Sequence, residues 1–316
     1  MATTFAVTPR AGAHSAPRPG RTTPRGRAIR RQLTGWAFVA PATIVVVGLS
    51  IFPAVWAFFI SRAKWNGIAP GVPVGWRNYQ NLVSDPDMVA ATKHTLVLTA
   101  LFVPGSILLG ILIAIALNQR IRLIGFYRTC IIVPYVASAA ATGILAGFVF
   151  NPQFGTANDV LRHLGLSQQQ FLENPHQALY IIVLIALWGE VGFTTVIYLA
   201  ALQDIPRELV EAAVMDGASK WRVFRHITIP ELRPVTVFAV VWQTITAMQL
   251  FDLIYTTTKG GPLNSTQTVV YYIYELAFQT QRLGYGAAAA YLLFLVTLLL
   301  TLIVIWYSRR RGSEVF

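Results

Sequence analysis

The chain of 316 residues is strongly apolar, with 55% hydrophobic and only 12% charged residues, whereas soluble globular proteins carry roughly 25% charged residues. This composition excludes an ordinary soluble domain and predicts a polytopic membrane protein. The net charge of +12 leaves nucleic-acid binding open until the basic residues have been located along the chain.

The first 34 residues are rich in Arg, Pro, Gly and Thr and show no hydrophobic periodicity. We expect residues 1–34 to form a disordered basic tail. Arg30-Arg31 resembles a twin-arginine export signal, but the apolar run that follows is long and lacks a small-residue cleavage site. The sequence therefore predicts a first span that stays in the membrane, and one membrane domain over residues 35–316.

Six apolar runs are long enough to cross a bilayer, which takes about 20 residues for roughly 30 Å of hydrocarbon. The predicted fold is therefore an all-α polytopic membrane protein with six transmembrane helices. The segments between the runs are rich in Pro, Gly, Asn and Asp, which is typical of loops. The predicted spans are Gly35–Ile60, Thr95–Leu117, Ile124–Phe150, Ala178–Ala201, Val235–Thr256 and Ala287–Tyr307.

The basic residues are concentrated on one side of this topology. Eighteen of the 25 Lys and Arg residues lie before Gly35, in residues 119–128, in residues 203–233 or in residues 309–311. The positive-inside rule then places both termini and the 203–233 loop in the cytoplasm. Topology accounts for the basic excess, so we do not expect nucleic acid as a partner.

The predicted cytoplasmic loop contains the stretch "EAAVMDGASKWRVFRHITIP". Asp216-Gly217 predicts a turn between two short helices, and Ser219 can cap the second helix. We expect Asp204 to cap the first helix and Pro230 to end the second. An apolar ridge recurs every three residues at Trp221, Phe224 and Ile227.

Two interpretations of this ridge follow from the residues alone. A short amphipathic helix can insert its apolar side chains into a groove on another protein. It can equally rest among lipid headgroups, with its basic residues close to anionic lipid.

The stretch "EAAVMDGASKWRVFRHITIPELRP" resembles the EAA loop of the permease subunits of ABC importers. It has Glu-Ala-Ala, a Gly six residues after that Glu, and Ile-x-x-Pro after nine further residues. Ile229 replaces the commoner Leu, which is a conservative departure. Four other segments are similar to carbohydrate-importer permeases of the maltose and glycerol-phosphate type, and to the first permease of the pair: Tyr127–Ser138, Leu187–Pro206, Gly260–Phe278 and Gly284–Val296.

The resemblance covers the chain from about Gly35 to its end and implies a coupling helix that docks on an ATPase. It implies a second homologous permease, two copies of a cytoplasmic ABC ATPase and an extracellular solute-binding protein as partners, with lipid around the spans. It also implies a bacterial cell membrane as the location. The coupling residues that it implies are Glu211, Ala212, Ala213, Asp216, Gly217, Phe224, Ile227 and Pro230.

The chain has no G-x-x-x-x-G-K-[ST] phosphate loop, so we expect a partner subunit to bind and hydrolyse ATP. Its five His show no metal-ligand spacing, and its single Cys130 has no partner for a disulfide. No Ser/His/Asp arrangement is visible either. We therefore expect a transport subunit without a cofactor, a metal or enzymatic activity of its own.

Ionisable and aromatic residues inside the predicted spans indicate a solute path, because ionisable groups are costly in a membrane and sugars suit carboxylates, amides and aromatic rings. The alternative for Glu190 is a hydrogen bond that only holds the helices together, and for Trp188 it is plain packing. Like-charge repulsion from Glu190 mildly disfavours an anionic solute, but the sequence does not name the solute. The candidate path residues are Trp188, Glu190, Phe193, Thr246, Gln249 and Asp252.

The segment "GGPLNST" after the fifth run is predicted to be external. Gly-Gly-Pro favours a tight turn, and the resemblance places this loop near the gate and the receptor-docking surface. A rival hypothesis is a self-sufficient proton-coupled transporter that uses Glu190 and Asp252 as relay groups. Such carriers commonly contain internal repeats, and none is evident here; a membrane-bound enzyme would need a catalytic cluster, which is also not visible.

Overall fold

The computed structural model describes residues 24–119 and 122–310 and divides into two units, 1–56 and 57–316, each of which is described by itself. In the first unit, helix α1 (Pro24–Val46) begins before the boundary expected for the basic tail, so residues 24–34 are helical. The prediction of disorder for residues 1–23 lies outside the described residues.

Helices make up nearly all of the regular structure, and one short hairpin pairs β1 with β2. After α1 the first unit continues through a π-helical turn into α2, which crosses into the second unit. The remaining elements are η1 (Val47–Ile51), α2 (Phe52–Ser61), β1 (Ala63–Lys64), β2 (Val72–Pro73), α3 (Arg77–Ser84), α4 (Pro86–Leu117), α5 (Ile124–Val136), α6 (Ala139–Val149), α7 (Thr156–His163), η2 (Phe171–Glu173), α8 (Ala178–Asp204), α9 (Arg207–Met215), α10 (Lys220–Val223), η3 (Phe224–Thr228), α11 (Ile229–Glu231), α12 (Arg233–Met248), α13 (Asp252–Thr256), α14 (Val269–Tyr274), η4 (Glu275–Gln279) and α15 (Leu283–Arg310).

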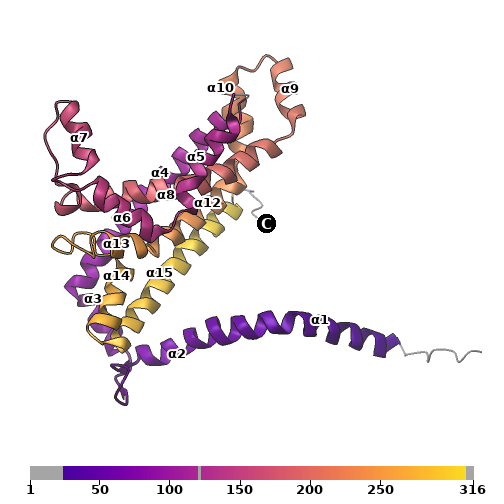
Figure 1. Cartoon of the computed structure of the whole chain (residues 1–316). Helices are drawn as coiled ribbons and strands as arrows, with labels where there is room; N and C mark the ends of the chain where they lie inside the picture. The colour runs from indigo at the N-terminus through magenta and orange to yellow at the C-terminus, as the bar shows by residue number, and fades with distance from the viewer. Residues whose placement is uncertain (1–23, 120–121, 311–316) are drawn as a thin grey trace, which may run out of the picture. The chain divides into compact units, whose positions relative to one another are not determined.

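Within the described residues, five helical segments are long and apolar enough to cross a membrane, and a sixth span results if α5 and α6 count as one. The prediction of an all-α membrane fold with six spans is confirmed in this form. Figure 1 shows α9 and α10 together at one end of the helices of the second unit, away from α7 and α13. The five long segments are Thr34–Ser61, Pro86–Leu117, Ala178–Asp204, Arg233–Thr256 and Leu283–Ser308.

The third span departs from the expectation of one continuous helix. Its two halves, α5 and α6, are bent by 99° at a break formed by Ala137 and Ser138. Both residues have extended backbone angles. Pro134 lies in the last turn of α5, where it cannot donate the backbone hydrogen bond that would continue the helix, and prolines are a common cause of sharp kinks. The predicted span over 124–150 therefore consists of two helices joined at an angle.

Glycines allow the central helices to approach each other at backbone distance. A Cβ atom on Gly110 of α4 would lie 2.5 Å from Thr194 Cγ2 of α8. A Cβ atom on Gly192 of α8 would lie 2.4 Å from the carbonyl oxygen of Ile131 in α5. Small residues at such contacts are the usual means of close helix packing in membranes, so α8 is held tightly against both neighbours.

One carboxylate ties together three elements at the end of the second unit that is remote from α9. Asp85 caps α4 and accepts hydrogen bonds from the hydroxyls of Tyr272 (2.9 Å) and Tyr285 (2.7 Å). Burial raises the pKa of the Asp85 carboxyl, but the bonds from Tyr285 and Tyr272 and from the backbone outweigh this effect, so its pKa lies below the ordinary value. The charged form of Asp85 therefore holds α14 and α15 against the start of α4.

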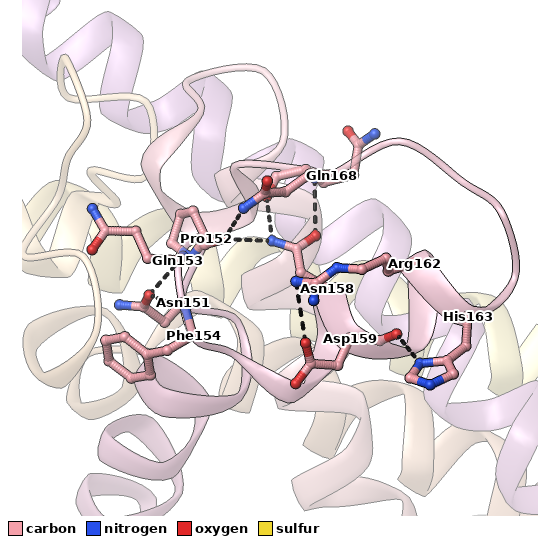
Figure 2. Close-up of polar contacts among 10 residues, drawn as sticks. Asn151, Pro152, Gln153, Phe154, Asn158, Asp159, Arg162, His163 and Gln168 are labelled. Atoms are coloured by element: carbon pink, nitrogen blue, oxygen red, sulfur yellow. Dashed lines mark hydrogen bonds and ion pairs between the residues drawn. The ribbon is translucent and has the colours of Figure 1, made fainter.

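The segment between α6 and α8 is closed by a buried asparagine, as Figure 2 shows. Asn158 is 3% exposed, and its Nδ2 donates to the carbonyl oxygens of Pro152 (3.0 Å) and Gln169 (2.9 Å). Its Oδ1 accepts from the backbone N–H of Gln169 at 2.9 Å. A single side chain thus fixes both ends of the loop that contains α7.

Candidate functional site

The loop between α8 and α12 has a defined shape that is set by its backbone. Helix α9 ends in a Schellman motif: the N–H of Ala218 donates to Ala213 O at 2.9 Å, and the N–H of Gly217 donates to Val214 O at 3.0 Å. Gly217 has φ +78°, a conformation that glycine adopts without steric cost. The predicted turn at this glycine is confirmed.

The ends of the two loop helices were predicted with mixed success. Ser219 caps α10, since its Oγ accepts from the N–H of Arg222 at 3.4 Å. Asp204 does not cap α9, because it is the last residue of α8. Pro230 does not end the second helix either: it lies in the first turn of α11 (Ile229–Glu231), where its missing N–H costs nothing.

The loop exposes large apolar side chains that have no cover in the described chain. Met215 is 87% exposed, Trp221 is 65% exposed and Val214 is 57% exposed. Trp221 packs against Phe224 with ring centroids 5.6 Å apart, as the three-residue spacing predicted. Met215 was not among the predicted residues, although its position beside the Asp-Gly turn indicates exposure.

The structure brings only some of the predicted coupling residues together. Ala213, Asp216 and Ile227 line a notch of about 270 Å³ between α9 and the α10–η3 segment, to which Arg222 and His226 also contribute. Glu211 and Ala212 are exposed on α9, Gly217 forms the turn, and Phe224 and Pro230 are partly buried. Their role in coupling stays a prediction.

A cavity of about 130 Å³ lies among α4, α8, α12 and the break between α5 and α6. Glu190 and Thr246 both line it, together with Tyr135 and Phe102. Ala137 of the helix break lines it as well. Non-helical backbone within a membrane is tolerated where it lines a cavity. The position of the helix break beside this cavity is consistent with that rule.

A buried polar network lies next to Glu190 and joins three helices. Thr194 Oγ1 of α8 lies 2.6 Å from Gln243 Nε2 of α12 and 2.8 Å from Ser106 Oγ of α4. All three side chains are at most 1% exposed. Glu190 Oε2 and Gln243 Oε1 are buried without a hydrogen-bond partner among the described residues. Ser106, Thr194 and Gln243 were not predicted; the only signal was a polar residue within each apolar run.

The other candidate path residues lie outside this cavity. Phe193 stacks on Tyr135, with ring centroids 5.2 Å apart, and contacts the tilted ring of Trp242 at 5.4 Å. Trp188 is 52% exposed, and Gln249 and Asp252 are exposed as well; none of the three lines the cavity. Of the predicted path residues, the structure therefore brings together Glu190 and Thr246.

The "GGPLNST" segment forms the tight turn that was expected. Lys259, Gly260, Leu263 and Asn264 all have positive φ, and Thr266 Oγ1 donates to Gly261 O at 2.8 Å. This turn and residues 150–152 line a common cavity of about 360 Å³. The turn therefore faces the loop that contains α7.

Comparison with known proteins agrees with this architecture. Residues 106–313 match the family "Binding-protein-dependent transport system inner membrane component". The chain is 34% identical to the sn-glycerol-3-phosphate transport system permease UgpA of Agrobacterium fabrum over 84% of this chain and 91% of that protein. It is 32% identical to the trehalose/maltose transport system permease MalF of Thermococcus litoralis, over 89% and 96% of the two chains.

The fold is also that of a solved importer subunit. A bacterial alginate ABC transporter, crystallised in complex with an alginate pentasaccharide-bound periplasmic protein, superimposes with a TM-score of 0.80 over 91% of this chain and 98% of that chain, at 24% identity. The resemblance drawn from the sequence motifs is confirmed. The chain belongs to the family of inner membrane components of binding-protein-dependent transport systems, as a permease of the ABC importer type.

Proposed function

We propose that this chain is one of two permease subunits of an ATP-driven importer for a carbohydrate or related solute. A second, homologous permease would complete the translocation path, two copies of a cytoplasmic ATPase would drive it, and an extracellular binding protein would deliver the solute. Both termini and the α9–α10 loop would face the cytoplasm of a bacterial cell.

The observation that carries the proposal is the shape of the α9–α10 loop. A hydrogen-bonded Schellman turn lies between Met215 and Trp221, and both side chains are exposed. Exposed apolar side chains of this size are costly in water and suit a groove on another protein. Because the chain has no phosphate-binding loop of its own, an ATPase is the partner that an importer needs at this place.

The carbohydrate class is supported by the cavity and by the named relatives. The cavity combines a carboxylate and a hydroxyl with the rings of Tyr135 and Phe102, which suits the hydroxyl edges and apolar faces of sugars. The relatives are named for trehalose and maltose and for sn-glycerol-3-phosphate. In the full importer the second permease would enlarge this cavity to the size of the solute.

The proton-coupled alternative receives less support. A relay through Glu190 and Asp252 needs the two carboxyls to share a path, but Asp252 is exposed and does not line the cavity that contains Glu190. The proton relay therefore requires the carboxyl group of Asp252, whereas the importer mechanism does not.

Uptake by the reconstituted importer tests the proposal. Proteoliposomes would contain this chain, its partner permease and its ATPase, and radiolabelled saccharides would be supplied on the loaded binding protein. We expect Glu190→Leu to lower the rate of uptake at least tenfold, because it removes the carboxylate from the cavity. A tenfold change corresponds to about 1.4 kcal/mol in the interaction free energy between solute and cavity.

The comparison variant is Asp252→Leu, for which we expect a smaller loss of uptake than for Glu190→Leu because Asp252 does not line the cavity. Equal loss in both variants would favour the proton relay. Wild-type rates in Glu190→Leu would contradict the assignment of the cavity to the solute path.

A further inference from the structure

A second large cavity lies at the end of the second unit that is remote from α9 and α10. It measures about 620 Å³ and lies between the β1–β2 hairpin, α3 and the start of α15. It shares no lining residue with the cavity around Glu190. It is therefore separate from the proposed solute path.

The walls of this cavity are fixed by backbone contacts. The N–H of Gly284 donates to Trp65 O at 3.1 Å, and Asn78 Nδ2 donates to Ser61 O (2.8 Å) and Ala63 O (3.1 Å). A Cβ atom on Gly284 would lie 1.9 Å from Ala63 O. The hairpin and α15 are thus packed so closely that the cavity is a built feature of the fold.

The cavity carries three cations and no carboxylate. Lys64, Arg77 and Arg282 line it, and no Asp or Glu is among its lining residues. None of the three forms an ion pair within the part of the chain that the structure describes. Arg282 is held over the ring of Tyr285, 4.3 Å from its centroid. The positive-inside rule leaves only seven Lys and Arg residues on this side, so three in one cavity need another explanation.

The surroundings of the cavity match the boundary between a membrane and water. It lies beside the end of α2 and the start of α15, where two spans leave the hydrocarbon. Trp65 lines it, and Trp76, which directly precedes the lining residue Arg77, is 55% exposed; tryptophan is enriched at the membrane–water boundary. Ile68 (82% exposed) and Val72 (61% exposed) extend from the hairpin. Apolar residues beside cations suit an amphiphile better than a soluble anion.

We propose that this cavity binds the phosphate headgroup of an anionic phospholipid. Lys64, Arg77 and Arg282 contact the phosphate, and the apolar hairpin residues contact the start of the acyl chains. Basic pockets between membrane helices bind anionic headgroups by the same chemistry. The site does not depend on transport activity, and it shares with the proposed function only the membrane orientation of the spans.

Lipid retention by the full-length chain tests this proposal. The chain would be purified in detergent with equal amounts of phosphatidylglycerol and phosphatidylcholine, and native mass spectrometry would count the lipids that remain bound. We expect preferential retention of phosphatidylglycerol by the wild type. The triple variant Lys64→Gln/Arg77→Gln/Arg282→Gln should reduce that retention at least about tenfold, given the contribution of each cation.

The matched control is Lys93→Gln/Arg162→Gln/Lys259→Gln, which removes the same charge from the same side but outside the cavity. It should retain phosphatidylglycerol like the wild type. Size-exclusion profiles check that both variants are folded, and the double variant Lys64→Gln/Arg77→Gln replaces the triple one if Arg282 proves necessary for folding.

Four results would overturn the proposal. Equal loss in both triple variants would show general electrostatic attraction, and equal retention of the two lipids by the wild type would exclude a selective site. Binding of inorganic phosphate alone, measured by calorimetry, without retention of phosphatidylglycerol would assign the cavity to a free anion. Loss of stimulation by the binding protein with unchanged lipid retention would assign it to protein docking.

Discussion

Replacing Gly217 by proline is expected to reduce the stimulation of ATP hydrolysis by the loaded binding protein at least tenfold in the reconstituted importer. Gly217 has φ +78°, whereas proline fixes φ near −65°. The change therefore breaks the Schellman turn and redirects α10 relative to α9. No atom lies within 4 Å of a Cβ built on this glycine, so the effect arises from the backbone and not from a clash.

The matched control at this position is Gly217→Asn. Asparagine is several-fold enriched among non-glycine residues with positive φ and is an accepted residue at the end of a helix. We expect it to retain most of the stimulated hydrolysis. Size-exclusion chromatography would check that each variant assembles, because the loop lies outside the helix bundle. Stimulation of ATP hydrolysis at the wild-type level in Gly217→Pro would contradict a role of this turn in coupling.

Thr194→Val is expected to lower the free energy of unfolding by about 2 kcal/mol or more, since a buried polar group left without its partner costs about 1–3 kcal/mol. The substitution keeps the shape of the side chain but leaves Gln243 Nε2 and Ser106 Oγ without their bonds to the threonine hydroxyl. Thermal unfolding of the purified chain in detergent measures the effect as a lower melting temperature.

The neighbouring threonine provides a control with the opposite expectation. Thr195 is also 1% exposed, but its Oγ1 has no hydrogen-bond partner among the described residues. Thr195→Val removes an unpaired buried hydroxyl, so we expect a melting temperature equal to or above that of the wild type. Equal destabilisation by the two substitutions would show that the network of Thr194 contributes no special stability.

The spans and the loop turn could be predicted because both depend on local properties of the sequence. Membrane crossing requires a run of apolar residues, and only glycine adopts the conformation at residue 217 without strain. Glu190 was recognised for a similar reason, since an ionisable side chain in an apolar run is conspicuous.

The features that could not be predicted depend on contacts between residues that are distant in the sequence. The Ser106–Thr194–Gln243 network needs three helices in register, and single Thr, Ser and Gln residues occur in many apolar runs. Pro134 is the one residue near the break at Ala137 and Ser138 that indicates a kink in the sequence. Alanine gives no such indication, because it is common in continuous helices. Trp188 and Gln249 have side chains that suit a sugar; in this chain they are exposed and lie outside the cavity, and their place in the solute path stays a prediction.

The most direct test of the account is the energy source of solute uptake. Proteoliposomes that contain this chain, its partner permease and its ATPase would be loaded with ATP or with its non-hydrolysable analogue, with and without a protonophore. We predict uptake that requires ATP and the loaded binding protein and that persists when the proton gradient is collapsed. Uptake that continues without the ATPase and stops with the protonophore would contradict the importer assignment and favour a proton-coupled carrier.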